Sequence, residues 1–184
     1  MSGFIGEFFG TLVLIVLGTG CGAAINLQKS YAKGASWLYV TIAWGMAVTF
    51  GVYVAASLGS QGHLNPAVTI GFASFGFFPW SEVGPYLLGQ FLGAFVGAAL
   101  VAIQFYPHFK ATKTSEAGNN VGIFATAPAI KNNLFNFLSE TIATFIFVFA
   151  LLNLGDFDKG LKPIAVGLLI MVVGQALGGS TGFG

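Results

Sequence analysis

Long apolar stretches alternate with short polar ones along this chain. Five of the apolar stretches approach or exceed the ~20 residues that a helix needs to cross ~30 Å of hydrocarbon. They lie at residues 4–26, 37–58, 84–106, 134–154 and 161–178. The stretches between them are rich in lysine and in turn-forming residues, which is typical of loops. The pattern predicts an all-α membrane protein with five spans, of which the last is interrupted by glycines near its end.

A sixth apolar piece, residues 66–78, is too short to span. It begins with Asn65-Pro66-Ala67, and an asparagine before a proline is typical of a helix start, with Asn65 as the cap and Pro66 in the first helical position. A helix that begins inside a membrane exposes N–H groups that hydrocarbon cannot satisfy, so its start must face a polar path. We expect a re-entrant half-helix that belongs to a channel or a transporter. An ordinary connecting helix is the alternative.

Composition agrees with a membrane protein and excludes several function classes. The chain is 55% hydrophobic and only 7% charged, whereas soluble domains have about 25% charged residues. Its net charge of +1 gives no electrostatic reason to expect nucleic-acid binding. The single cysteine, Cys21, excludes an internal disulfide and a cysteine-rich metal site. The spans contain no paired aspartates and no cluster of metal ligands, so no enzyme, metal or cofactor is expected.

Glycines recur at four-residue spacing inside the spans. The sets are Gly6 and Gly10, Gly18 and Gly22, and Gly89, Gly93 and Gly97. Small residues at this spacing let helix backbones approach closely in lipid. The sequence therefore predicts tight helix crossings, although the glycines indicate no substrate.

The two halves of the chain resemble each other. Each begins a span with a glutamate four residues before a threonine, Glu7 in the first half and Glu140 in the second. Residues 59–63 and 179–183 both begin with Gly-Ser and carry a second glycine two residues after the serine. Three spans separate the two glutamates, so the second copy is inverted. Inverted repeats are typical of proteins that bind or conduct a solute near the membrane midplane.

We therefore expect one transmembrane channel domain over residues 1–184, with a first repeat at about 1–106 and a second at about 134–184. In register with the first copy, the two residues after Gly184 would be an asparagine and a proline. We expect the 184 residues to be a truncated version of a longer protein, in which a second half-helix and a last span follow.

Glu7 and Glu140 lie inside spans, where a buried carboxylate is costly unless it is hydrogen-bonded. One interpretation is a proton or ion site, as in a coupled transporter. The other is structural: each carboxylate accepts N–H bonds from the irregular loop of its own half. The symmetric placement of the two glutamates favours the structural role.

Five motifs occur in order along the whole chain. They are Gly6-Glu7-Phe8-Phe9-Gly10-Thr11, His63-Leu64-Asn65-Pro66-Ala67-Val68-Thr69, Gly89-Gln90, Glu140-Thr141 and Gly179-Ser180-Thr181-Gly182-Phe183. In this order they resemble the aquaporin superfamily, also called the major intrinsic proteins, and within it the glycerol facilitator branch. The resemblance implies an aquaporin-like right-handed bundle with an inverted repeat, here five spans plus one half-helix. It also implies a homotetramer with one pore per subunit.

The resemblance places a pore constriction at Trp44, Gly174 and Phe183. Its fourth position, an arginine after a second Asn-Pro-Ala box, would come after Gly184. Trp44 and Phe183 would form an apolar corner for the carbon chain of a polyol. Gly174 would leave space where a water-selective relative has a bulkier histidine. These positions favour glycerol over water alone.

The segment before the half-helix supplies the polar part of the expected pore. Asn65 offers two amide N–H donors to a passing hydroxyl, and the positive end of the half-helix behind it repels cations. Gly62, His63 and Leu64 are expected to be extended, so that their carbonyls form a ladder of acceptors. We expect His63 to support this loop or to line the path rather than to bind a metal.

We therefore predict a channel for passive diffusion of glycerol and other small uncharged solutes, with some water, that excludes ions and protons. A water-selective aquaporin, a proton-coupled secondary transporter and a non-conducting membrane protein are the alternatives. The resemblance implies a multi-pass protein of the cell membrane with a cytoplasmic N-terminus. In that orientation five lysines fall outside and two inside, which is opposite to the usual bias. The external ones are Lys29, Lys33, Lys110, Lys113 and Lys131, and the internal ones are Lys159 and Lys162.

Overall fold

The computed structural model describes residues 2–112, 120–155 and 160–183, so that Lys113, Lys159 and Gly184 lie outside it. Every regular element in this part of the chain is helical. The long helices are α1 (Ser2–Asn26), α2 (Trp37–Ser57), α4 (Trp80–Gln104) and α7 (Asn133–Leu152). The shorter ones are α3 (Pro66–Ser74), α5 (Tyr106–Ala111), the 3-10 helix η1 (Asn120–Ile123) and α8 (Lys162–Ala176). The four long helices are long and apolar enough to cross a membrane.

The predicted fifth span, 161–178, is longer than the helix found there. α8 has 15 residues and measures roughly 22 Å at ~1.5 Å per residue. It ends because the N–H groups of Leu177 and Gly178 both donate to the carbonyl of Val173. At Gly178 a Cβ would lie 2.6 Å from the carbonyl oxygen of Gly174, so the turn requires glycine. The prediction of a fifth full span was therefore wrong in length.

Two other differences concern the loops. The half-helix was predicted over 66–78, but α3 stops at Ser74 because Gly76 takes a left-handed φ of 79° and donates its N–H to Ala73. The predicted loop 107–133 contains α5 and η1, two short helices that the apolar pattern does not indicate.

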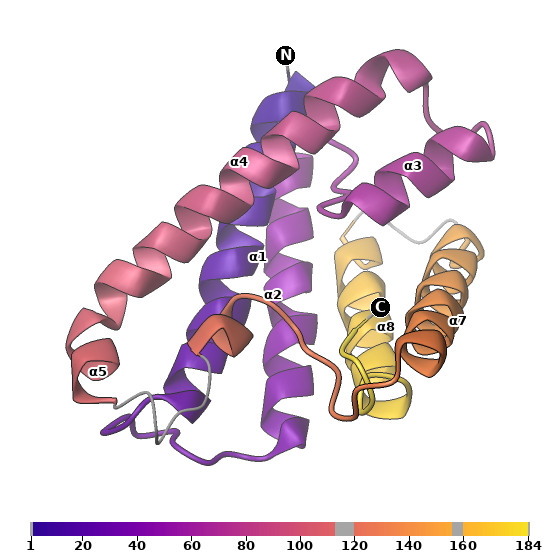
Figure 1. The fold of residues 1–184 in the computed structure, drawn as a ribbon. Coiled ribbons are helices and arrows are strands. Elements are labelled where there is room, and N and C mark those ends of the chain that lie inside the picture. Colours follow the sequence, from indigo (N-terminus) through magenta and orange to yellow (C-terminus); the bar gives the residue numbers. More distant parts are fainter. Residues whose placement is uncertain (1, 113–119, 156–159, 184) are drawn as a thin grey trace.

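The helices form two groups, which Figure 1 shows. α1 and α2 run side by side and α4 crosses α1, while α7 and α8 stand together on the other side. α2 packs against α8 and so joins the groups. α3 contacts α4 and α7, which places the start of the half-helix inside the molecule.

The crossings are as close as the glycine spacing predicts. A Cβ on Gly93 would lie 2.3 Å from the carbonyl oxygen of Phe8, and one on Gly89 would lie 2.7 Å from that of Phe4. Backbone therefore touches backbone along the contact between α1 and α4. α2 and α8 cross in the same way, since a Cβ on Gly45 would lie 2.6 Å from the carbonyl oxygen of Gly167.

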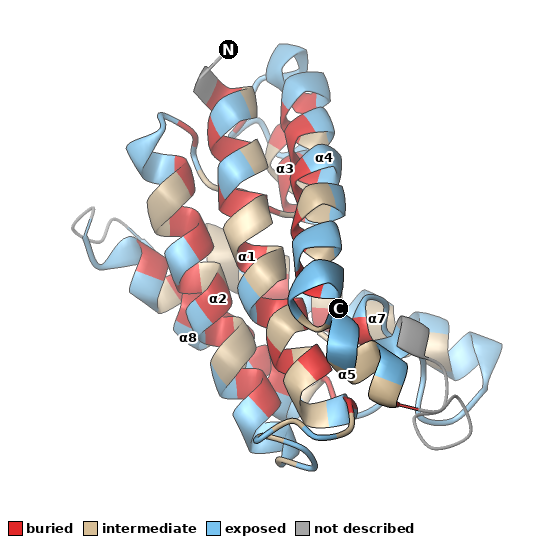
Figure 2. Ribbon diagram, turned by 90° about the vertical axis from the view of Figure 1, so that its left-hand side faces the viewer, coloured by how far each residue is buried: buried red, intermediate tan, exposed pale blue. Residues whose placement is uncertain are grey.

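Much of the outside of the long helices is exposed (Figure 2), and many of the exposed side chains are large and hydrophobic. Large hydrophobic side chains on α4 and α7 are exposed, among them Phe91, Phe95 and Phe145. In α7 only Ala143 and Phe147 are buried. An exposed apolar surface of this extent fits contact with lipid rather than water, so the fold is that of a multi-pass membrane protein.

Candidate functional site

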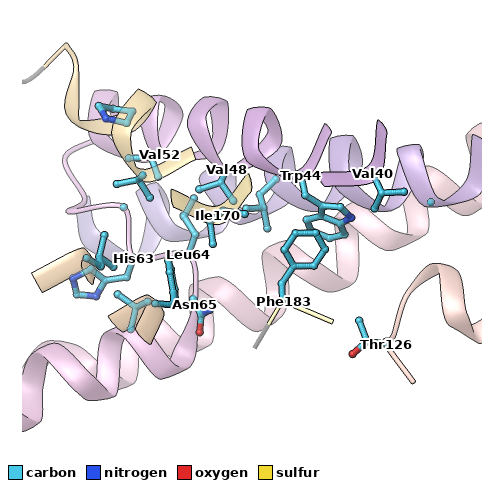
Figure 3. A pocket seen from close by; sticks show the side chains of 18 of the residues that line it. Val40, Trp44, Val48, Val52, His63, Leu64, Asn65, Thr126, Ile170 and Phe183 are labelled. Atoms are coloured by element: carbon cyan, nitrogen blue, oxygen red, sulfur yellow. The ribbon is translucent and has the colours of Figure 1, made fainter. Parts of the chain in front are cut away.

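A cavity of about 950 Å³ runs along one face of α2. Val40, Trp44, Val48 and Val52, each four residues after the last, line it in one row (Figure 3). Trp37 and Ala56, near the two ends of α2, line it as well. At ~1.5 Å of rise per residue these two positions are roughly 28 Å apart, close to the ~30 Å thickness of the hydrocarbon core of a bilayer. The cavity thus extends over the depth of a membrane, and α2 gives it an apolar wall.

The facing wall includes the segment from Gln61 to Asn65. No hydrogen bond within the described part of the chain is donated to the carbonyl groups of residues 61–64. Carbonyl groups inside a protein normally have hydrogen-bond partners, so these acceptors are left for water or a solute. The passage therefore has one apolar side and one side rich in acceptors.

Glu7 holds this segment from behind. Its carboxylate is fully buried and accepts four hydrogen bonds. One oxygen accepts from the backbone N–H of His63 at 2.9 Å and from the hydroxyl of Ser60. The other accepts from the N–H of Leu64 at 2.7 Å and from the side-chain amide of Gln90 at 2.7 Å. Glu7 does not line the cavity, so its geometry is that of a support and not of a group open to solutes.

Leu64 shows how tightly the segment is constrained. The prediction that this segment is extended was wrong at two residues, since Gly62 has a φ of 71° and Leu64 a φ of 52°. Both values lie in the left-handed region, which costs a residue with a Cβ, such as Leu64, roughly 1–2 kcal/mol. Its side chain is buried in a slot that two glycines leave open: a Cβ on Gly10 would lie 2.7 Å from Leu64 Cδ2, and one on Gly51 would lie 2.9 Å from Cδ1. Packing and the bond to Glu7 together hold a backbone conformation that leucine rarely adopts.

Asn65 caps the half-helix. Its backbone is extended, and its Oδ1 accepts the N–H of Ala67 at 2.8 Å, with Pro66 in the first turn. The amide nitrogen of Asn65 has no acceptor among the described residues, and the side chain lines the cavity (Figure 3). Its two N–H donors are therefore available to a solute.

His63 is part of a buried network and also reaches the cavity. Its Nδ1 lies 3.2 Å from Thr69 Oγ1 and its Nε2 lies 3.3 Å from Gln61 Oε1. The ring packs against Phe78 and Tyr86, with centroids 4.7 and 5.0 Å away. Both ring nitrogens have polar neighbours in the protein, so the ring is positioned by the loop that it supports.

Two of the predicted constriction residues, Trp44 and Phe183, line the cavity and contact each other. The rings of Trp44 and Phe183 have centroids 5.9 Å apart. A Cβ on Gly18 would lie 2.5 Å from Trp44, so this glycine makes room for the indole. Gly174 differs from expectation: it does not line the cavity, and the ring of Phe183 fills its space, since a Cβ there would lie 2.1 Å from Phe183 Cε1. Gly174 thus admits the phenyl ring rather than leaving an open corner.

The expectation that Glu140 supports its loop as Glu7 does stays a prediction. Glu140 is half-buried and lines the cavity. Among the described residues, Ser139 contacts the segment 179–183, with its hydroxyl 2.6 Å from that of Ser180. Gly184, which the register matches with Leu64, lies outside the described part.

The sequence motifs contain Gln90 and Thr69 but gave them no role, and sequence reasoning missed Trp37. Gln90 and Thr69 complete the network behind the half-helix through a bond of 2.9 Å. Trp37 joins Trp44 and Phe183 at the predicted constriction, with its ring centroid 5.7 Å from that of Phe183. The spacing of four along α2 was a usable signal for the cavity wall, but nothing local indicates the contact between Trp37 and Phe183.

Known proteins give the following comparisons. The family model described as major intrinsic protein matches residues 1–184. Glycerol uptake facilitator protein 2 of Lactiplantibacillus plantarum is 68% identical over 183 residues, which cover 100% of this chain and 78% of that protein. The glycerol uptake facilitator protein of Streptococcus pneumoniae strain R6 is 46% identical over 185 residues, with 100% and 78% covered. The X-ray structure of the aquaglyceroporin from Plasmodium falciparum superimposes with a TM-score of 0.85 at 33% identity, covering 99% of this chain and 74% of that one.

Proposed function

This chain belongs to the major intrinsic protein family, and we propose that it is a membrane channel for passive diffusion of glycerol and other small uncharged solutes, with some passage of water. Relatives named as glycerol uptake facilitators match the whole chain at up to 68% identity. Proteins of this family are channels and not enzymes.

The observation that carries the proposal is the two-sided cavity along α2. A polyol has hydroxyls along a carbon chain, so it needs hydrogen-bonding groups on one side and tolerates apolar groups on the other. The carbonyls of residues 61–64 and the amide of Asn65 supply the first, and the row of valines on α2 supplies the second. A solute on this path exchanges its bonds to water for bonds to the protein.

Trp44, Gly174 and Phe183 form the narrow part of the proposed passage. The two aromatic rings meet at 5.9 Å between centroids and can contact the carbons of glycerol. The ring of Phe183 reaches this position because residue 174 has no side chain. In this proposal Gly174 acts on selectivity through Phe183 rather than by direct contact with the solute.

The arrangement favours a channel over a proton-coupled transporter. A carboxylate that binds and releases a proton must be reachable and must change its partners. Glu7 is fully buried, does not line the cavity and holds four donors, so its geometry does not meet these conditions. The positive end of α3 and the amide of Asn65 repel cations, which supports exclusion of ions and protons.

We also propose a homotetramer in the cell membrane, with a cytoplasmic N-terminus. A shallow groove of about 380 Å³ on the outside of α1 and α2, lined by Leu17, Tyr39 and Met46, offers an apolar surface to a neighbouring subunit. The mass of the detergent-solubilised complex measures the number of subunits.

Light scattering from proteoliposomes tests the channel. We expect rapid entry of glycerol, no entry of sorbitol, and no change when a proton gradient is collapsed. Substitution Val48→Trp places a large side chain in the cavity, and we expect it to slow glycerol entry by about tenfold or more, as ~1.4 kcal/mol of added barrier would.

Ile42→Trp is the matched control, because Ile42 lies six residues before Val48 on α2, is exposed, and lines neither this cavity nor the groove on the outside of α1 and α2. Glycerol entry that is equally fast in both variants would place the passage elsewhere. Fast water flow without glycerol entry would make the protein a water-selective channel.

A further inference from the structure

The last turn of α8 leaves a carbonyl that the helix itself does not use. A helix ends with four carbonyls that lack intrahelical partners. At the end of α8 the N–H groups of Leu177 and Gly178 both donate to Val173, so that the carbonyl of Gly174 receives no backbone N–H among the described residues. It accepts instead from the indole Nε1–H of Trp37, at 3.0 Å. The donor comes from the first residue of α2, 137 positions earlier in the chain.

The same indole packs on the ring of Phe183. The two centroids are 5.7 Å apart with 38° between the planes, a tilted arrangement in the favourable range for aromatic pairs. The ring of Phe183 thus lies between Trp37, Trp44 and Gly174. It lies so close to Gly174 that a Cβ at position 174 would overlap it. Trp37 contacts both residues: its indole N–H donates to the carbonyl of Gly174, and its ring packs against that of Phe183.

We propose that Trp37 is a positioning residue that sets the width of the constriction. This inference rests on the proposed function. The indole N–H binds the carbonyl of Gly174 and so holds the backbone against which the ring of Phe183 lies. The indole rings keep Phe183 against Gly174 and so prevent the phenyl ring from swinging into or out of the passage.

A tryptophan near the end of a membrane helix is often only an interface anchor, whose N–H faces lipid headgroups. Trp80, the first residue of α4, fits that description: it is 62% exposed and its indole N–H has no acceptor among the described residues. Trp37 is also exposed, to 44%, but its N–H is bonded inside the protein and its side chain lines the cavity. The chain therefore offers a matched control for the proposal.

The test compares the permeability of proteoliposomes to glycerol and to erythritol, which is one carbon longer. Trp37→Phe keeps a ring beside Phe183 and removes the donor. We expect the erythritol-to-glycerol ratio to rise about fivefold, the factor that corresponds to one hydrogen bond worth ~1 kcal/mol. Trp80→Phe is expected to leave the ratio unchanged. A ratio that is unchanged in Trp37→Phe, while the unsubstituted protein passes glycerol, overturns the proposal.

Benzothienylalanine at position 37 separates the hydrogen bond from packing, because it keeps the fused rings and replaces N–H by sulfur. The ratio is expected to rise in this variant too, and a ratio equal to that of the unsubstituted protein contradicts the role of the N–H.

A second readout does not depend on flux: 4-fluorophenylalanine at position 183 is followed by ¹⁹F NMR. One sharp resonance is expected, which broadens or splits in Trp37→Phe. If the unsubstituted protein passes no glycerol, the proposed channel function is wrong. If the ¹⁹F spectrum is unchanged in Trp37→Phe, the proposed positioning role of Trp37 is wrong.

Discussion

Residues 60–63 and 180–183 share the pattern Ser-x-Gly-x, but they are held in different ways. The first segment rests on the buried carboxylate of Glu7, which binds two backbone N–H groups and the hydroxyl of Ser60. The second is held by the hydroxyl of Ser139 and by a backbone bond of 2.9 Å from Ala129 to Ser180. Similar sequence therefore does not imply a similar source of stability.

The groups that bind the two segments differ in burial and in charge. Hydrogen bonds to a charged group contribute ~1.5–3 kcal/mol, against ~1 kcal/mol for neutral pairs, and the bonds to Glu7 are shielded from water. The hydroxyl pair of Ser139 and Ser180 is exposed, so water can replace either partner at little cost. We expect the first segment to be rigid and its Glu7 network to dominate the stability of the protein.

Glu7→Gln gives the largest expected effect. The substitution keeps the size of the side chain but turns one acceptor oxygen into an N–H₂ group that faces donors. We expect a loss of ~3 kcal/mol or more in stability, since at least two charge-assisted bonds are lost. Glycerol entry should fall with it, because the 61–64 carbonyls lose their support. Thermal unfolding in detergent and light scattering of proteoliposomes measure the two effects.

Glu140→Gln is the control for that experiment, since Glu140 makes no hydrogen bond to its own loop among the described residues. We expect a change below ~1 kcal/mol, in the range of an ordinary substitution away from a buried network. If Glu140→Gln lowered the stability as much as Glu7→Gln, the two segments would depend equally on their glutamates, which would contradict the difference between them.

Two helix glycines, Gly93 and Gly20, differ in how closely a neighbouring helix approaches them. Gly93 lies against α1 with no room for a methyl group, whereas at Gly20 the nearest atom to a Cβ would be a side-chain carbon of Val101, 4.0 Å away. We expect Gly93→Ala to cost ~1–3 kcal/mol, as overpacking does. Gly20→Ala should be neutral or stabilising by up to ~1 kcal/mol, because alanine favours helices. Thermal unfolding of both variants measures the difference, and equal midpoints would show that α1 and α4 can separate freely.

Local signals in the sequence were sufficient for part of this structure. Asn65 and Pro66 fixed where α3 begins, and the glycine spacing predicted the close approach of α1 and α4. Both depend on residues near one another in the chain. The end of α8 is also local: the glycines near it indicated an interruption, but not the residue at which the helix stops, which depends on which N–H reaches the carbonyl of Val173.

Contacts between distant residues account for most of what was missed at the site. The bond from Trp37 to Gly174 joins positions 137 residues apart, and no local pattern specifies it. The role of Gly174 was misjudged for the same reason: its neighbour in space, Phe183, comes from a separate segment whose ring fills the vacant volume. For the symmetric pair Glu7 and Glu140, the network of Glu7 is described, whereas the same role for Glu140 stays a prediction.

Ser60 and Ser180 allow the smallest and most direct comparison, because they are the same residue type in the same register. Ser60 is buried, donates to Glu7 and accepts the N–H of Gly62 at 3.0 Å. Ser60→Ala removes one of the two donors to Glu7 Oε1 and the acceptor of the Gly62 N–H, so we expect a loss of ~1–3 kcal/mol. Ser180→Ala removes only an exposed hydroxyl pair, and we expect less than ~0.5 kcal/mol. Unfolding midpoints measured side by side decide the matter: a larger loss in Ser180→Ala would mean that hydroxyls, and not the buried carboxylate, stabilise segments of this kind.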